Sequence, residues 1–161
     1  MAPSDPVRQL ILLNLQTTLQ GMTDPASFHF PVPNADAVTL DPTVAILTRG
    51  FPDLPFYMVE PTPDGKREFW QSEQITDDFT VNVIGRYDAD SADPSSKMKI
   101  WEKLAADVEV ALEADMTRGG HVSDTRCAPV QPFTAVGSNI VIVVIPVVMK
   151  IYRRYGRPDQ P

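Results

Sequence analysis

The chain has 161 residues, with a hydrophobic content of 43% and a charged content of 22%, which is typical of one globular domain with a substantial core. Its single cysteine, Cys127, excludes an intrachain disulfide framework and a multi-cysteine zinc site. The first ten residues lack the basic start and apolar stretch of a signal peptide, so we expect a protein made and kept in a reducing cytoplasm.

Charge is distributed unevenly along the chain, whose net charge is −7. Residues 141–161 hold four of the 14 basic residues and one of the 21 acidic residues, so this end carries +3 and residues 1–140 carry −10. A basic end on an acidic body is compatible with simple solubility, and it also favours charge complementarity between subunits or with a partner. Because an acidic body repels phosphates, we expect no direct sequence-specific binding of nucleic acid.

The first predicted helix lies in "SDPVRQLILLNLQTTLQG", where Asp5 can cap the first turn and Pro6 fits the first helical position. Gly21 fits the end of this helix. Apolar residues recur at three- and four-residue steps and predict one buried face: Val7, Leu10, Ile11, Leu15 and Leu19.

The region from Thr23 to Gly65 is punctuated by prolines and aspartates, and "PTPDGK" is a strong turn signal. Short strands are predicted there at residues 28–30, 38–40, 43–48 and 55–60. The chain then alternates apolar and polar residues through Phe79, Val81, Val83 and Gly85, which predicts a strand. Ile84 makes its opposite face partly apolar, which favours cover on both sides.

The second predicted helix lies in "ADPSSKMKIWEKLAADVEVALEAD", with Asp93 as its cap and Pro94 at its first position. Lys99, Lys103 and Asp107 follow at four-residue steps, and we expect them on the solvent side. The apolar stripe that should pack on the sheet contains Trp101, Leu104, Ala105, Val108 and Leu112.

After this helix, Gly119 and Gly120 predict a turn, and "PVQPF" is interpreted as a proline-stiffened connection. The apolar run Ile140–Met149 is about half the roughly 20 residues that a membrane-spanning helix needs, so we expect no membrane anchor. Its valines and isoleucines favour a core strand. Because Pro146 has no N–H to donate, we expect two strands, or one strand broken at Val144–Pro146, with Pro146 at an edge, a bulge or a bend.

The order of these elements predicts an α+β fold, in which two main helices pack on one face of an antiparallel β-sheet. We expect a single α+β domain over residues 1–152, followed by a mobile tail over residues 153–161.

Candidate reactive residues are few and scattered. His29 stands between two phenylalanines and is interpreted as a strand residue. His121, Ser123 and Asp124 are too close in sequence to converge readily as a catalytic triad, so a self-bonded turn is the better interpretation. Cys127 has no histidine in an activating position and is interpreted as a buried, inert thiol.

Acidic residues gather at Asp77–Asp78 and again at Asp88, Asp90 and Asp93. The second group lacks the glycine and the final glutamate of a helix-loop-helix calcium loop. A solvated loop that ends in a helix cap explains it, and no phosphate-binding loop or dinucleotide fingerprint is present. We therefore expect no metal, no cofactor and no catalysis, and a structural or assembly role becomes the leading class by elimination.

The layout of the chain resembles that of a known protein family. A first helix of the type "VRQLILLNLQTTLQG" precedes a proline-rich sheet region. A second helix of the type "KLAADVEVALEAD" leads directly to the small-residue turn "MTRGGHV", and a last strand ends in the aromatic and basic pattern "KIYRRY". In these respects the chain resembles the tail terminator (tail completion) proteins of long-tailed bacteriophages.

The resemblance implies a subunit of a ring, expected to contain six copies, that caps the finished tail tube and joins the tail to the head connector. Its partners would be other copies of itself, the tail tube protein and a neck or connector protein. Its location would be the tail–neck region of the virion, and the host cytoplasm during assembly. The residues expected at an interface with a neighbouring copy or ring are Val144, Pro146, Lys150, Arg153 and Arg154.

Two other interpretations remain open at this point. The same layout would suit another ring of the phage neck, such as a head-completion or stopper protein. A small cytosolic enzyme or ligand-binding module is an alternative of a different class, and the oligomeric mass separates it from the rings.

Overall fold

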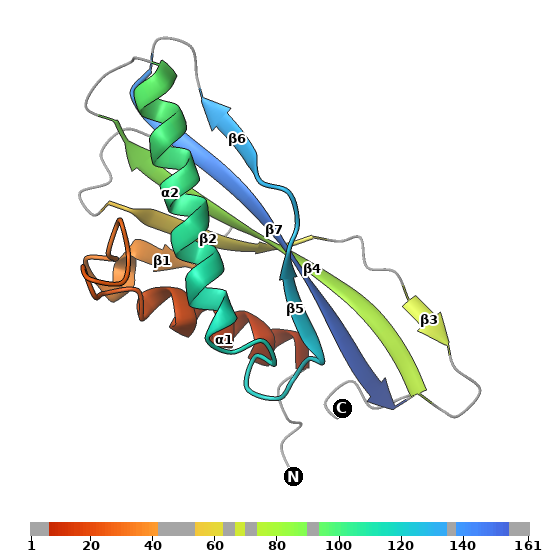
Figure 1. Ribbon diagram of the computed structural model, residues 1–161. Coiled ribbons are helices and arrows are strands. Elements are labelled where there is room, and N and C mark those ends of the chain that lie inside the picture. Colours follow the sequence, from red (N-terminus) through yellow and green to blue (C-terminus); the bar gives the residue numbers. More distant parts are fainter. Residues whose placement is uncertain are drawn as a thin grey trace.

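The computed structural model describes residues 7–41, 54–62, 67–69, 74–89, 94–134 and 138–154. Two helices, α1 (Val7–Gln20) and α2 (Pro94–Glu113), lie on one face of a twisted sheet (Figure 1). A short 3-10 helix, η1 (Ala35–Ala37), precedes the first strand. The strands are β1 (Val38–Thr39), β2 (Phe56–Pro61), β3 (Arg67–Phe69), β4 (Gln74–Asp88), β5 (Asp124–Cys127), β6 (Gln131–Thr134) and β7 (Ile140–Arg154). The predicted α+β fold with helices on one face is confirmed.

The strand order is β1-β2-β4-β7-β5, with β3 paired to β4 and β6 paired to β7. All described pairs are antiparallel except β1–β2, which is parallel, so the sheet is mixed and not purely antiparallel. Its centre is the β4–β7 ladder, which runs without interruption from Gln74↔Arg154 to Asp88↔Ile140. Two strands of this length span about 50 Å.

The predicted break in the last strand is wrong, because β7 is continuous through Pro146. The carbonyl of Pro146 accepts from the N–H of Ala128 at 2.7 Å, so its backbone polar groups face β5 and β6. At that point β5 has ended at Cys127 and β6 begins only at Gln131. The missing N–H of Pro146 therefore costs no ladder hydrogen bond to β4.

The core lies between the helices and the near face of the sheet. The predicted stripe of α1 is buried at Val7, Ile11, Leu15 and Leu19, while Leu10 is half-buried. In α2 the predicted residues Leu104, Ala105, Val108 and Leu112 are buried, and Trp101 packs half-buried against the same cluster. The sheet contributes alternate residues of β4 and β7, including Phe79, Val81, Val83, Val143, Ile145, Val147, Met149 and Ile151. Each such aliphatic side chain stabilises the fold by about 1.5–3 kcal/mol when fully buried.

Several other expectations can be compared with the described residues. The strands expected at residues 38–40 and 55–60 are found as β1 and β2, whereas residues 28–30 form a bend and no strand. "PVQPF" is not a plain connection, because Gln131–Thr134 forms β6 against β7. α2 begins at Pro94 as expected. Asp5, Pro6, residues 43–48, Asp90 and Asp93 lie outside the described residues.

The expected boundary between domain and tail also differs from the structure. Arg153 and Arg154 were assigned to a mobile tail, but their backbones are paired in the sheet, opposite Ile75 and Gln74. The strand extends this far because β4 also begins further back than the alternating pattern indicated, at Gln74. Residues 155–161 lie outside the part of the chain that the structure describes.

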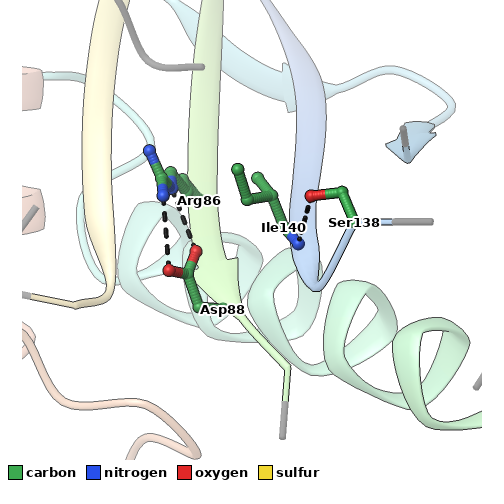
Figure 2. A network of polar contacts seen from close by, with 4 residues as sticks. All are labelled: Arg86, Asp88, Ser138 and Ile140. Carbon is green, nitrogen blue, oxygen red and sulfur yellow. Dashed lines mark hydrogen bonds and ion pairs between the residues drawn. The ribbon is translucent and has the colours of Figure 1, made fainter. Parts of the chain in front are cut away.

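Polar contacts lie at the end of the β4–β7 ladder where Asp88 pairs with Ile140 (Figure 2). Arg86 is buried and its Nε donates to Asp88 Oδ1 at 3.1 Å, while a second guanidinium nitrogen donates to Oδ2 at 3.3 Å. On the neighbouring strand the N–H of Ile140 donates to Ser138 Oγ at 3.1 Å. Asp88 is therefore the last residue of β4 and holds the buried Arg86 through two hydrogen bonds, and the prediction that it belongs to a solvated acidic loop is wrong.

Candidate functional site

Of the positions expected for Pro146, namely an edge, a bulge or a bend, the edge is wrong, because Val144 and Pro146 lie inside the sheet. Val144 pairs with Ile84 of β4 on one side and with Gln131 of β6 on the other, so it is interior to the sheet. Both side chains are half-buried on the far face, defined here as the face of the sheet opposite α1 and α2. Pro146 has no N–H to donate, and this missing donor faces the gap between the end of β5 and the start of β6, not the boundary of the sheet.

Lys150 also belongs to the far face and is exposed, between Asp78 of β4 and Asp124 of β5. A hollow of about 470 Å³ lies here, lined by Asp78, Ser123, Asp124, Arg126, Val148 and Lys150. Arg126 Nε donates to Asp124 Oδ2 at 2.5 Å, so charges of both signs are already paired within the hollow. This arrangement offers no net charge to attract a ligand.

A second hollow, the α2–β5 groove, lies between the C-terminal half of α2 and the edge strand β5. Its volume is about 380 Å³, and its lining is Glu109, Leu112, Glu113, Met116, Thr125, Arg126 and Cys127. Thr125 Oγ1 donates to the carbonyl of Met116 at 2.8 Å, which ties β5 to the turn after α2. The groove thus combines an apolar floor with two carboxylates at the negative end of a helix dipole.

Cys127 lines the α2–β5 groove, and its thiol is affected by the burial and the negative charge there. Burial, followed by the negative charges of Glu109 and Glu113, raises the pKa of Cys127 to about 11, and the nearby Arg118 opposes the rise. The thiol therefore stays protonated at neutral pH and is a poor nucleophile. Its side chain is only half-buried, so the expected inertness has an electrostatic cause as well as burial.

The turn after α2 is built as the sequence indicated. Arg118, Gly119 and Gly120 adopt φ values of 49°, 70° and 83°, which suit the two glycines. The carboxylate of Asp115 accepts from the hydroxyl and N–H of Thr117 and from the N–H of Gly119. These hydrogen bonds, first that of the Thr117 hydroxyl, lower the pKa of Asp115.

The closely spaced His121, Ser123 and Asp124 serve this turn and the strand after it. His121 ends the turn, Ser123 Oγ donates to the carbonyl of Lys150 at 3.3 Å, and Asp124 holds Arg126. Ser123 and Asp124 thus bond to β7 and to the Arg126 side chain and not to the backbone of their own turn, so the interpretation as a self-bonded turn is wrong for these two side chains.

Asp107 lies in the core, and the prediction that it faces solvent is wrong. It is only 2% exposed. Its two carboxylate oxygens accept from the N–H groups of His29 and Phe30, each at 2.8 Å. A signal was present, because Asp107 follows Leu104 by three residues and precedes Ala111 by four, which places all three on one helix face.

His29 itself has an exposed side chain, and its backbone makes the recorded contact. Tyr57 lies deeper in the core, and its hydroxyl has no hydrogen-bond partner in the described part of the chain. Burial, and secondarily the charge of Asp107, raises the pKa of Tyr57 far above its ordinary value. The ring fits because β4 has Gly85 opposite, where a Cβ would stand 2.9 Å from Tyr57 Cε1.

The carboxylates of β4 are structural as well. Asp77 is 2% exposed and lies 3.6 Å from a guanidinium nitrogen of Arg8 in α1. The same guanidinium lies over the ring of Phe79, 5.1 Å from its centroid. Across the described residues, no three His, Cys, Asp or Glu side chains gather in a way that could hold a metal ion.

The described residues therefore form an α+β fold with two surface hollows, one of which, the α2–β5 groove, is lined by two glutamates. In the described part of the chain, neither helix combines the length and apolar character needed to cross a membrane. No protein-family profile matches the chain, and no curated protein sequence matches it either.

Proposed function

We propose that this protein is a structural subunit of a ring that caps a phage tail tube and joins the tail to the head connector. Its partners in this proposal are neighbouring copies, the tail tube protein and a connector protein. It acts in the host cytoplasm during assembly, resides at the tail–neck region of the virion, and performs no catalysis.

The observation that carries the proposal is a contrast in charge between an acidic groove and a basic segment of the same chain. The α2–β5 groove is lined by Glu109 and Glu113, whereas the end of β7 and the following residues carry Lys150, Arg153, Arg154 and Arg157. Subunits of a ring meet head to tail, so each must present two different, complementary surfaces. The resemblance in layout to tail terminator proteins supplies the particular position in the virion.

The rigid β4–β7 ladder also suits this role. It extends beyond both helices, toward the side where β3 lies (Figure 1). A long paired ribbon can carry a basic end to a neighbouring subunit without the entropy cost of an unpaired arm.

The test combines mass with activity on tubes. We expect sedimentation of the purified protein to give a ring of about six subunits, and negative-stain images to show that ring at one end of assembled tubes. When tube protein polymerises in its presence, the tubes should stop at a defined length, whereas without it they should continue to grow. A protein that stays monomeric at every concentration and leaves tube length unchanged would contradict the proposal.

A further inference from the structure

One edge of β5 has no neighbouring strand among the described residues. β5 is the last strand of the described sheet and pairs only with β7. The N–H of Ala128 points to β7, where it donates to Pro146. Since backbone groups alternate in direction along a strand, those of Thr125 and Cys127 point away from β7 and into the α2–β5 groove. An edge strand that faces a groove is a template for an added strand.

The charge of the groove indicates what kind of strand would bind. Glu109 and Glu113 are exposed, lie one helical turn apart, and stand beside the negative end of α2. The only cation of the lining, Arg126, is already paired with Asp124. Cys127 lies in the lining of the same groove, where burial first, and then the charges of Glu109 and Glu113, raise the pKa of its thiol. The surface therefore favours a basic segment.

This chain carries such a segment itself. "IYRRYGR", residues 151–157, contains three arginines and no acidic residue. The register of β5 on β7 ends at Lys150, while β7 continues to Arg154 with β4 on its other side. Among the described residues, the side of β7 that β5 covers elsewhere is thus unpaired from Ile151 to Arg154. This leaves a second free edge, adjacent to the basic residues.

We propose that the α2–β5 groove binds residues 151–157 of a second copy, which adds as a strand along β5 and places arginine guanidinium groups beside Glu109 and Glu113. The contact is heterologous, because the groove of one subunit receives the strand end of the next. Backbone pairing with β5 provides the direction of the strand, and the two glutamates select a basic segment. This inference rests on the proposed ring, since it names the surfaces through which the copies meet.

A charge-exchange experiment tests the pairing. The first variant carries Glu109→Arg and Glu113→Arg, and the second carries Arg153→Glu and Arg157→Glu, two positions that share one face of an added strand. We expect each to raise the concentration needed for oligomer formation by roughly tenfold or more, because like charges then face one another. A third variant with all four changes restores opposite charges, and it should assemble like the parent protein, as measured by sedimentation.

The matched control carries Glu60→Arg and Glu102→Arg, which change the charge equally at two exposed positions outside the groove. It should assemble like the parent. Raising the ionic strength from about 0.05 M to 0.5 M should weaken the parent oligomer, since exposed charge pairs are screened within about 10 Å at 0.1 M. Circular dichroism of every variant reports folding.

A second measurement does not depend on the oligomer. A fluorescent peptide of sequence IYRRYGR should bind the parent chain and should bind the Glu109→Arg, Glu113→Arg variant at least roughly tenfold more weakly. Normal assembly of both two-site variants, or a four-site variant that folds but does not assemble, would overturn the groove contact and leave the ring intact. A parent protein that is monomeric throughout would instead overturn the proposed ring.

Discussion

The two faces of β7 differ although one backbone carries both. On the helix side, alternate residues from Val141 to Ile151 are at most 1% exposed. On the far face, Ile142 is 4% exposed, Val144 and Pro146 are half-buried, Val148 is 36% exposed and Lys150 is exposed. The apolar character of the side chains is similar over much of this length, so it does not decide their burial. From Val144 to Lys150, burial follows cover by α1 and α2, and the period of two sorts neighbouring residues into different environments. Further along the far face, Ile142 is buried beside Arg86 and Phe56 without cover from these helices.

The sharpest test of this difference uses two adjacent valines. Val147→Asp places a carboxylate on the covered face with no partner, and we expect a loss of about 5 kcal/mol or more, enough to unfold the protein. Val148→Asp makes the same change on the far face and should cost under about 1 kcal/mol. Urea denaturation and soluble yield measure both. Equal losses at the two positions would show that the far face is also covered in the folded chain.

A second test addresses polar groups beneath the helices. Asp107→Ala removes the acceptor of two backbone N–H groups, at His29 and Phe30, and should destabilise the protein by about 3 kcal/mol. Asp107→Asn retains one acceptor oxygen and should lose less. Thermal unfolding compares the three proteins. A change below about 0.5 kcal/mol for Asp107→Ala would mean that water replaces the carboxylate at this position.

The burial of Cys127 is intermediate between that of the covered face and that of the exposed residues, because it lies on the edge strand β5 and lines the groove. Its pKa is raised to about 11, so at pH 8 its thiolate fraction should be about 100-fold lower than that of a thiol with the ordinary value of 9.0. We expect iodoacetamide to modify the native chain roughly 100-fold more slowly than the urea-unfolded chain, as followed by mass spectrometry. Glu109→Gln with Glu113→Gln should accelerate native modification. Similar rates in folded and unfolded protein would contradict the electrostatic account.

The smallest expected effect is at Tyr57, the buried hydroxyl without a described partner. Tyr57→Phe should change stability by less than about 1 kcal/mol at pH 7, because no hydrogen bond to a described residue is lost. The pKa of Tyr57 is raised, so its neutral form contributes stability that is present below pH 10 and is lost as the pH rises above that value. Melting curves from pH 8 to 11 should therefore fall more steeply for the parent than for Tyr57→Phe. Parallel curves would show that Tyr57 ionises freely.

Parts of the candidate site were predictable and parts were not. The charge contrast was visible in the sequence, because it requires only counting Lys150, Arg153 and Arg154 against an acidic body. The acidic member of the proposed contact was not predicted, because Glu109 and Glu113 form a groove only when β5 lies beside α2. The interior position of Val144 and Pro146 could not be predicted, because strand order cannot be deduced from one strand's pattern.

The sequence by itself determined the helices, the alternation of β4 and β7, and the turn at Gly119 and Gly120, because periodicity, caps and glycine conformation are local properties. Only the tertiary structure decided that β7 runs unbroken in the interior of the sheet, that Asp107 is buried, and that β5 leaves an edge beside α2. These outcomes depend on which distant segments pair. A missing donor at Pro146 is harmless, and a carboxylate at Asp107 is stabilising, only because of the neighbours that the fold brings to each of them.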